Sequence, residues 1–291
     1  MITKTMSAAL LAIAGAAAFL PSTTSAAIVY ADGDLILGFR ATGGTGASTD
    51  YLIDLGPASA FINSLSPVNF TLGNIGADLT AIFGSWATRS DVLWSISGVQ
   101  KIAGNGFANN TMFATRSDTI SAPLGTNTTT PWVRPSSFGA GTPAGKIQSM
   151  SQKYGAGTNG SVAGTDQIES TNAPGALIQP TGQTNSFVSF QPFGINTAGS
   201  SAYSYFNDAS GIESNFSAGT AASVLDLYQL TPGAGSLPAT FNGNFTISEG
   251  AVVTFTPAGV VPEPTAGFSV ILGTAILGAF RRRSRGAVAK S

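Results

Sequence analysis

The C-terminal thirty residues constrain this chain most, because an uncharged apolar run there ends in a block of positive charge. The run covers residues 265–280, and its only polar side chains are Thr265, Ser269 and Thr274. As a helix, these sixteen residues would be roughly 24 Å long, somewhat short of the roughly 30 Å hydrocarbon layer of a bilayer. Snorkelling of the flanking arginines and local thinning of the bilayer compensate for such a deficit.

The charged block decides between a membrane helix and a buried core helix, which is the usual alternative for so short a run. Four arginines follow the run directly: Arg281, Arg282, Arg283 and Arg285. A core helix seldom ends in a block of uncompensated charge, whereas basic residues next to a membrane segment stay in the cytoplasm and act as a stop and retention signal. We therefore expect a transmembrane helix over 265–280, a cytoplasmic tail over 286–291, and the remainder of the chain outside the cytoplasm.

The N-terminus shows the three parts of a secretory signal peptide. Lys4 supplies a positive start, an apolar stretch covers residues 8–20, and Pro21 is followed by small residues. This apolar stretch is too short for a comfortable membrane anchor. We therefore expect signal peptidase to cleave near Ala26 or Ala27, which makes residues 1–26 a signal peptide handled by the export machinery.

Immediately before the apolar run stands the motif Pro262-Glu263-Pro264. Each proline fixes its own φ and pushes the residue before it toward extended geometry, which suits recognition as an extended peptide. Pro-Glu-Pro, an apolar helix and an arginine cluster, in this order at the C-terminus, resemble the PEP-CTERM sorting signal of exopolysaccharide-producing Gram-negative bacteria. The resemblance covers residues 262–285 and leaves residues 257–261 as a linker.

This resemblance implies a processing partner and a destination. In the PEP-CTERM family, a membrane-embedded cysteine protease-transpeptidase, the exosortase, recognises the motif, here Pro262, Glu263 and Pro264. It removes the tail and passes the protein from the inner membrane toward the cell surface. The body resembles a group of PEP-CTERM proteins from Verrucomicrobia and related bacteria, through ADGDLILGFRATGGTGASTDYLIDL (residues 31–55), LGNIGADLTAIFG and FTISEGAVVTFTP. The resemblance to that group adds no mechanism.

The composition of the body argues against one kind of function and favours a β-rich fold. Residues 27–260 carry thirteen acidic and seven basic side chains, a net charge of −6, which argues against binding nucleic acid through its phosphates. The chain has no cysteine, so stability outside the cell must come from the core alone. Few charges and abundant small polar residues are typical of an extracellular β-rich protein. We expect residues 27–256 to form one mainly β domain, an antiparallel sandwich or jelly-roll-like body with a few short helices.

Periodicity places the elements of this body. Residues 35–40 alternate Leu35, Leu37 and Phe39 with Ile36, Gly38 and Arg40, as a strand with one buried face does. Further strands are expected at 28–30, 50–55, 68–72, 92–97, 111–115, 187–190, 202–206 and 224–230, with a closing hairpin at 244–248 and 251–256. Helical turns are expected after Pro57 and over 78–83. The stretch 121–184 is predicted to be mostly loop, with one helix that Thr142 caps and that Gly155 ends. Ile147, Met150 and Tyr154 are spaced to lie on one face of this helix.

Residues suited to catalysis are few. With no histidine and no cysteine, Ser-His-Asp triads, Cys-His dyads and zinc or iron sites built from these ligands are excluded. We expect no cofactor and no metal, although a calcium ion at the turn Asp32-Gly33-Asp34 remains an alternative. The closest carboxylate pairs are Asp32/Asp34, Asp50/Asp54 and Asp166/Glu169. A glycosidase needs two such groups roughly 5–10 Å apart across a sugar, and acidic residues in turns are commonly only turn formers.

Three functions of different classes therefore compete. The favoured one is a non-enzymatic cell-surface or extracellular-matrix protein, sorted by an exosortase and associated with exopolysaccharide. The first alternative is a carbohydrate-binding module, for which Trp132, flanked by Pro131 and Arg134 in a polar loop, is the best candidate for stacking on a sugar. Trp94 lies in an apolar strand and is expected in the core. The second alternative is a carboxylate-based enzyme that acts on glycans.

Overall fold

The computed structural model of the chain describes residues 30–117, 140–154, 167–182, 186–187, 212–216, 222–233 and 238–258. The expected signal peptide, linker end, sorting motif, transmembrane helix and arginine block lie outside these residues, as does Trp132. Within the described part of the chain, no helix is both long enough and apolar enough to cross a membrane.

The described body is built almost entirely from antiparallel strands. They are β1 (Asp34–Ala41), β2 (Thr49–Pro57), β3 (Val68–Asn69), β4 (Val92–Gln100), β5 (Thr111–Ser117), β6 (Ile168–Glu169), β7 (Ala176–Pro180), β8 (Ser214–Asn215), β9 (Ala222–Leu230), β10 (Thr240–Ser248) and β11 (Val253–Pro257). The helices are α1 (Ile75–Phe83) and α2 (Gly141–Lys153), with 3-10 turns η1 (Ala58–Ala60) and η2 (Trp86–Thr88). The prediction of a mainly β body is confirmed.

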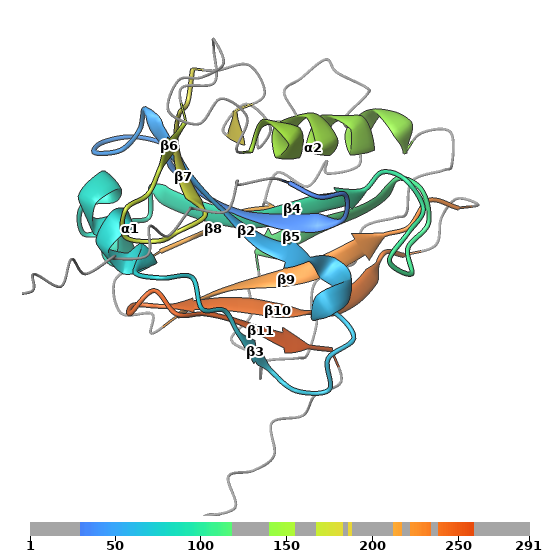
Figure 1. Cartoon of the computed structure of the whole chain (residues 1–291). Coiled ribbons are helices and arrows are strands. Elements are labelled where there is room, and N and C mark those ends of the chain that lie inside the picture. The colour runs from blue at the N-terminus through green and yellow to red at the C-terminus, as the bar shows by residue number, and fades with distance from the viewer. Residues whose placement is uncertain are drawn as a thin grey trace, which may run out of the picture.

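These strands form one hydrogen-bonded sheet in the order β3-β11-β10-β9-β5-β4-β1-β2-β7-β6, with β8 paired to β4 beside this path. The sheet curls like half a barrel, so that β9, β10, β11 and β3 lie beneath β4, β1 and β2 in Figure 1. Two halves of a single sheet therefore face each other. A sandwich, in contrast, is made of two separately hydrogen-bonded sheets. Its two edges, β3 and β6, are each only two residues long.

The curl encloses the larger of two hydrophobic cores. Alternate residues of β1, namely Leu35, Leu37 and Phe39, belong to it and are fully buried. The residues between them are buried as well, so β1 is covered on both faces and the expectation of a single buried face is wrong. The core also contains Trp94 of β4, likewise with no exposed surface, which confirms its expected place. Helix α1 closes one end of the curl with its buried residues.

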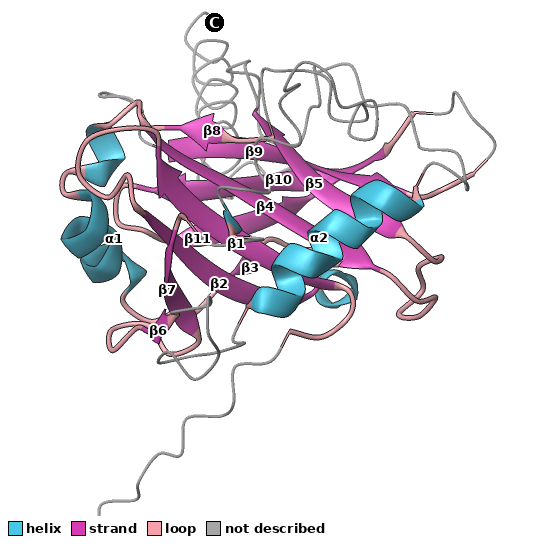
Figure 2. Ribbon diagram, turned by 90° about the horizontal axis from the view of Figure 1, so that it is seen from above, coloured by secondary structure: helices cyan, strands magenta, loops and turns pink. Residues whose placement is uncertain are grey.

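The second core lies on the outer face of the sheet, under α2. Ile36 of β1 and Leu52 of β2 belong to this core, together with Ile147, Met150 and Tyr154 at α2. Figure 2 shows α2 lying across the strands, and its contacts fall mainly on β4 and β5. The helical spacing of Ile147, Met150 and Tyr154 therefore predicts the buried face of α2 correctly.

The helix ends follow local chemistry, with one correction. Asn74 caps α1, because its Oδ1 accepts a hydrogen bond from the N–H of Ala77 at 3.2 Å, and Gly84 ends the helix with φ of 70°. The predicted cap of α2 is wrong: the helix begins at Gly141, one residue before Thr142, and the residue at its cap position, Ala140, has no side-chain oxygen to offer.

Several segments differ from the prediction. The stretch expected to be mostly loop contains β6 and β7, because residues 176–180 pair with the free edge of β2. After Pro57 the chain makes only the 3-10 turn η1, and only Val68–Asn69 of the expected strand 68–72 forms β3. The expected strand at 202–206 lies outside the described residues, and of the strand expected at 187–190 only Phe187 is described, in a helical conformation. The last strand ends at Pro257, one residue beyond the predicted domain boundary.

Candidate functional site

Most of the sequence-predicted site residues lie outside the described part of the chain. This holds for the sorting motif Pro262-Glu263-Pro264, for the arginine block at 281–285, for Ala26 and Ala27, and for Trp132 and Asp166. The carboxylates of the first two predicted pairs are described, and the structure separates them into different environments.

Asp32 anchors a loop. Its carboxylate accepts hydrogen bonds from the backbone N–H groups of Lys101 at 2.7 Å and Ile102 at 2.9 Å, and from Nε2 of Gln100 at 2.9 Å. Both carboxylate oxygens therefore face N–H donors, which hold the loop after β4 against the turn before β1. No group of three or more His, Cys, Asp or Glu among the described residues could hold a metal ion. The calcium alternative at Asp32-Gly33-Asp34 finds no support in this geometry.

Asp34 and Asp54 lie on the neighbouring strands β1 and β2. In the β1–β2 pairing, Ile36 lies opposite Asp54, and the register shifts between Asp34 and Ile36. This irregularity leaves Asp34 and Asp54 near each other on adjacent strands, so that the charge of Asp34 acts on Asp54. Each also accepts one backbone N–H at 2.7 Å, from Ala31 for Asp34 and from Gly56 for Asp54. The sequence pairs Asp32/Asp34 and Asp50/Asp54 are thus replaced by the pair Asp34–Asp54.

The environment of this pair favours protonation. Burial raises the pKa of Asp54 to about 7, opposed by the hydrogen bond from Gly56 and supported by the charge of Asp34. Burial also raises the pKa of Asp34, whose side chain belongs to a residue only 5% exposed. Both carboxyl groups therefore take up a proton more readily than an exposed aspartate does.

Two tyrosines complete the cluster from the side of α2. Tyr154, at the end of α2, accepts a hydrogen bond from the N–H of Asp54 at 3.2 Å and donates its own O–H to the carbonyl of Gly175. Tyr30 donates its O–H to the carbonyl of Val99 at 3.0 Å. Burial, followed by the charges of neighbouring carboxylates, raises the pKa of Tyr30, and for Tyr154 the hydrogen bond at Asp54 opposes the same effect of burial. Both phenols therefore stay neutral, and they close the cluster on one side.

A second buried carboxylate, Asp78, joins three elements. Its oxygens accept hydrogen bonds from the hydroxyl groups of Tyr51 and Ser170, each at 2.5 Å, and from Nδ2 of Asn172 at 2.7 Å. Asp78 thereby fixes α1 to β2 and to the loop before β7. Burial and the hydrogen bond to Asp78 raise the pKa of Tyr51, so this phenol remains a donor.

A buried ion pair lies farther along the outer face of the sheet. Arg40 of β1 makes two bonds to Glu213, from Nε to Oε1 at 2.7 Å and from its terminal nitrogen to Oε2 at 2.5 Å. Burial lowers the pKa of Arg40, but the hydrogen bonds and charge of Glu213, with a contribution from Asp50, outweigh it and raise the pKa. On β5 and β9, Arg116 and Asp226 occupy opposite positions of the register, and Asn244 donates to Asp226.

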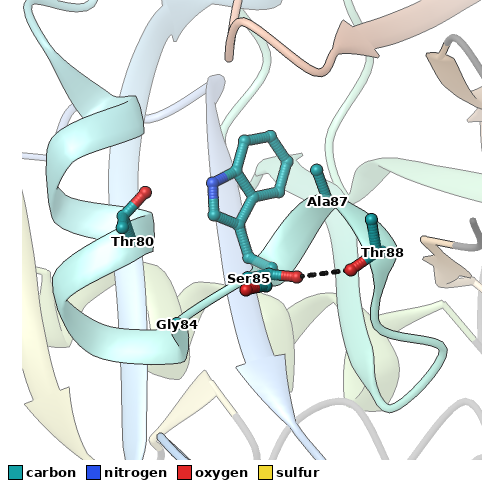
Figure 3. Close-up of a pocket in the computed structure, with 6 residues that line it drawn as sticks. Thr80, Gly84, Ser85, Ala87 and Thr88 are labelled. Carbon is teal, nitrogen blue, oxygen red and sulfur yellow. Dashed lines mark hydrogen bonds between the residues drawn. The ribbon is translucent and has the colours of Figure 1, made fainter.

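The described tryptophans offer no open ring face. Trp86 is 4% exposed and packs edge-on against Phe216, with ring centres 5.0 Å apart. It lines a shallow pocket of about 340 Å³ between the end of α1 and η2, with Thr80, Gly84, Ser85, Ala87 and Thr88 (Figure 3). A hydroxyl of this pocket is already used, because Thr88 donates to the carbonyl of Ser85 at 3.1 Å. Neither Trp86 nor Trp94 therefore forms a stacking platform for a sugar.

The described carboxyl groups are held by hydrogen bonds from the protein itself. Asp34 and Asp54 each accept a hydrogen bond from a backbone N–H group of the protein, at 2.7 Å. Asp32 and Asp78 are surrounded by hydrogen-bond donors of the protein itself. Sequence reasoning missed Tyr30, Tyr154, Glu213 and the pairing of Asp34 with Asp54, because each depends on strand register or on contacts between segments distant in sequence.

The chain matches no protein-family model, no curated protein sequence and no solved structure. Its function is therefore inferred from its own residues.

Proposed function

We propose that the chain is an exported cell-surface or extracellular-matrix protein, sorted by an exosortase-type protease and associated with exopolysaccharide, without a catalytic activity of its own. It would be an inner-membrane intermediate with its β body outside the cytoplasm until the tail is removed. The body would act as a β-sandwich-like module. The alternative function is that of a carbohydrate-binding module in which Trp132 stacks on a sugar. A carboxylate-based enzyme that acts on glycans is the third candidate.

The position of the proposed processing motif relative to the sheet carries this proposal. The last strand ends at Pro257, and the N–H of Ala258 donates to the carbonyl of Asn242 at 2.8 Å, which ties the end of the body to β10. Pro262-Glu263-Pro264 follows four residues later. A protease could therefore remove the tail at this motif without removing any described strand or helix.

The N-terminal side is arranged in the same way. The first strand begins at Asp34, beyond the expected cleavage near Ala26 or Ala27. Cleavage there would leave Tyr30 and the turn before β1 in the mature protein. Both proposed cuts would thus release an intact curled sheet, which is what a processed surface protein needs.

The uses of the described polar side chains support a role without catalysis. The carboxyl groups of Asp32, Asp34, Asp54 and Asp78 each have protein partners that hold loops, strands or α1 together. The pair Arg40–Glu213 joins two segments of the outer face. Such contacts stabilise a body that has no disulfide.

The decisive experiment is the intact mass of the protein released from the surface of its native host. We expect the native chain to lose the residues after the Pro262-Glu263-Pro264 region, and the double variant Pro262→Ala/Pro264→Ala to keep them and stay in the membrane fraction. The double variant Gly259→Ala/Val260→Ala, which changes the adjacent linker only, is the control and should be processed normally. If native and Pro-variant chains both keep the tail in the membrane, the protein is a single-pass anchored domain and the sorting proposal is wrong.

A further inference from the structure

The chain leaves the described body at one end of the curled sheet, after β11. The antiparallel register brings the ends of the other strands to the same place, through the pairs Pro257–Gly243, Thr240–Gln229, Leu230–Met112 and Thr111–Gln100. The loop between β4 and β5 and the segment between η1 and β3 therefore lie at the end where β11 finishes, on the right in Figure 1. We call residues 58–67, residues 101–110 and the end of β11 at Pro257 the exit end of the body.

The first loop of the exit end presents a leucine to solvent. Leu65 is 91% exposed, although Phe61 of the same loop is buried in the main core, with its ring centre 5.3 Å from that of Phe255. Around Leu65, the hydroxyl group of Ser64 accepts the N–H of Ser66 at 3.2 Å and donates to its carbonyl at 2.7 Å. An anchored and hydrogen-bonded loop thus holds the side chain of Leu65 outside the core.

The second loop presents an isoleucine in a similar way. Ile102 is 71% exposed. Its N–H donates to Oδ2 of Asp32 at 2.9 Å, and its carbonyl accepts a hydrogen bond from Nε2 of Gln100 at 2.7 Å. Both backbone groups of Ile102 are therefore bonded within the body, and its side chain is left facing water.

The sequence around these two residues is poor in charge. It contains no Asp, Glu, Lys or Arg over residues 55–77 or over residues 102–115. Lys101 donates from Nζ to Oδ1 of Asn110 at 2.7 Å and to the carbonyl of Gly141 at 3.3 Å, so its ammonium group is bonded within the body. Uncharged segments with exposed aliphatic side chains suit the boundary between lipid headgroups and acyl chains, because burial of apolar area there is favourable.

The length of the chain after β11 keeps the exit end close to a bilayer. Under the proposed function, on which this inference rests, residues 265–280 cross the membrane and the body stays outside the cytoplasm. Ala258 is fastened to the body, and seven residue steps lead from it to Thr265. A fully extended chain of this length spans at most about 25 Å. The opposite end of β11, where Val252 is 51% exposed in the turn after β10, lies farther from the tail.

We propose that the exit end is a membrane-docking surface, whose Leu65 and Ile102 enter the headgroup region of the non-cytoplasmic leaflet while the tail is in place. The partner of this surface is the lipid itself. Docking would hold the body in one orientation and keep Pro262-Glu263-Pro264 at the membrane surface, within reach of a membrane-embedded protease. Two aliphatic side chains bury little apolar area, so the body would leave the membrane once the tail is removed.

The test places a fluorescent probe at one position at a time, which is possible because the chain has no cysteine of its own. Leu65→Cys, Ile102→Cys and the control Val252→Cys are labelled with an environment-sensitive dye. Each full chain is reconstituted into vesicles of phosphatidylethanolamine and phosphatidylglycerol that contain a lipid spin-labelled in its headgroup. We expect a blue shift of the emission and a loss of intensity through the spin label at positions 65 and 102, and neither effect at position 252.

A second change tests whether the two side chains act together. With the dye at position 65, Ile102→Ser should weaken the quenching, whereas Val252→Ser should leave it unchanged. Equal quenching at positions 65, 102 and 252, or none at any of them, would show that the exit end does not dock. Flotation of the same vesicles separates the two proposals. A chain that floats but shows no difference between the positions overturns docking alone, whereas a chain that does not float with the vesicles overturns the membrane-anchored intermediate and docking together.

Discussion

At the scale of single residues, Gly38 of β1 lies very close to the ring of Phe187. A Cβ atom at position 38 would lie 2.2 Å from Cζ of Phe187, and both edges of the ring would also be too close. Phe187 is fully buried and belongs to the outer core. The absence of a side chain at Gly38 is therefore what allows this ring to lie against the sheet.

We expect Gly38→Ala to lower the free energy of unfolding by about 1–3 kcal/mol, because the ring or the strand must move to accept a methyl group. Thermal denaturation measures the change. Gly145→Ala is the matched control, since a Cβ atom added at Gly145 within α2 would meet no atom within 4 Å, and alanine is the better helix former by about 1 kcal/mol. Equal effects of the two substitutions would show that Phe187 does not rest on Gly38.

At the scale of elements, helix α1 depends on its first turn. Asn74 supplies the side-chain acceptor for Ala77, and the helix then places Ile75, Leu79 and Phe83 in the main core. Asn74→Ala should destabilise the protein by about 1 kcal/mol through the loss of this cap. Asn74→Asp keeps an acceptor at the same place and should recover most of the loss, as equilibrium denaturation in urea can show. A cap without energetic importance would leave both variants equal to the wild type.

Elements were predictable where the pattern is local, and not where it depends on a distant partner. The alternation of β1, the hairpin β10–β11 and the buried face of α2 follow from spacing within the segment itself. Strands β6 and β7 could not be found in this way, because the few apolar residues of 167–182 show no clear alternation. They become strands by pairing, β7 with β2 and β6 with β7. The pair Asp34–Asp54 was likewise hidden, since it requires the irregular register between two strands.

At the scale of the whole molecule, the body should be independent of the tail that follows it. Every described strand ends by Pro257, and the chain is fastened there by the hydrogen bond from Ala258 to Asn242. A chain that ends at Val261 should therefore keep the circular dichroism spectrum and the melting temperature of the body in the full chain. A fall of many degrees on truncation would mean that residues after 261 pack against the sheet.

The short edges of the sheet also matter when many copies lie together. An exposed strand edge is a template on which a second chain can pair, but β3 and β6 each present only two residues of backbone. A long ladder between neighbouring molecules thus has little to start from on the described body. At high concentration the described bodies should therefore stay separate particles, and any cohesion between them has to come from side chains rather than from paired strands.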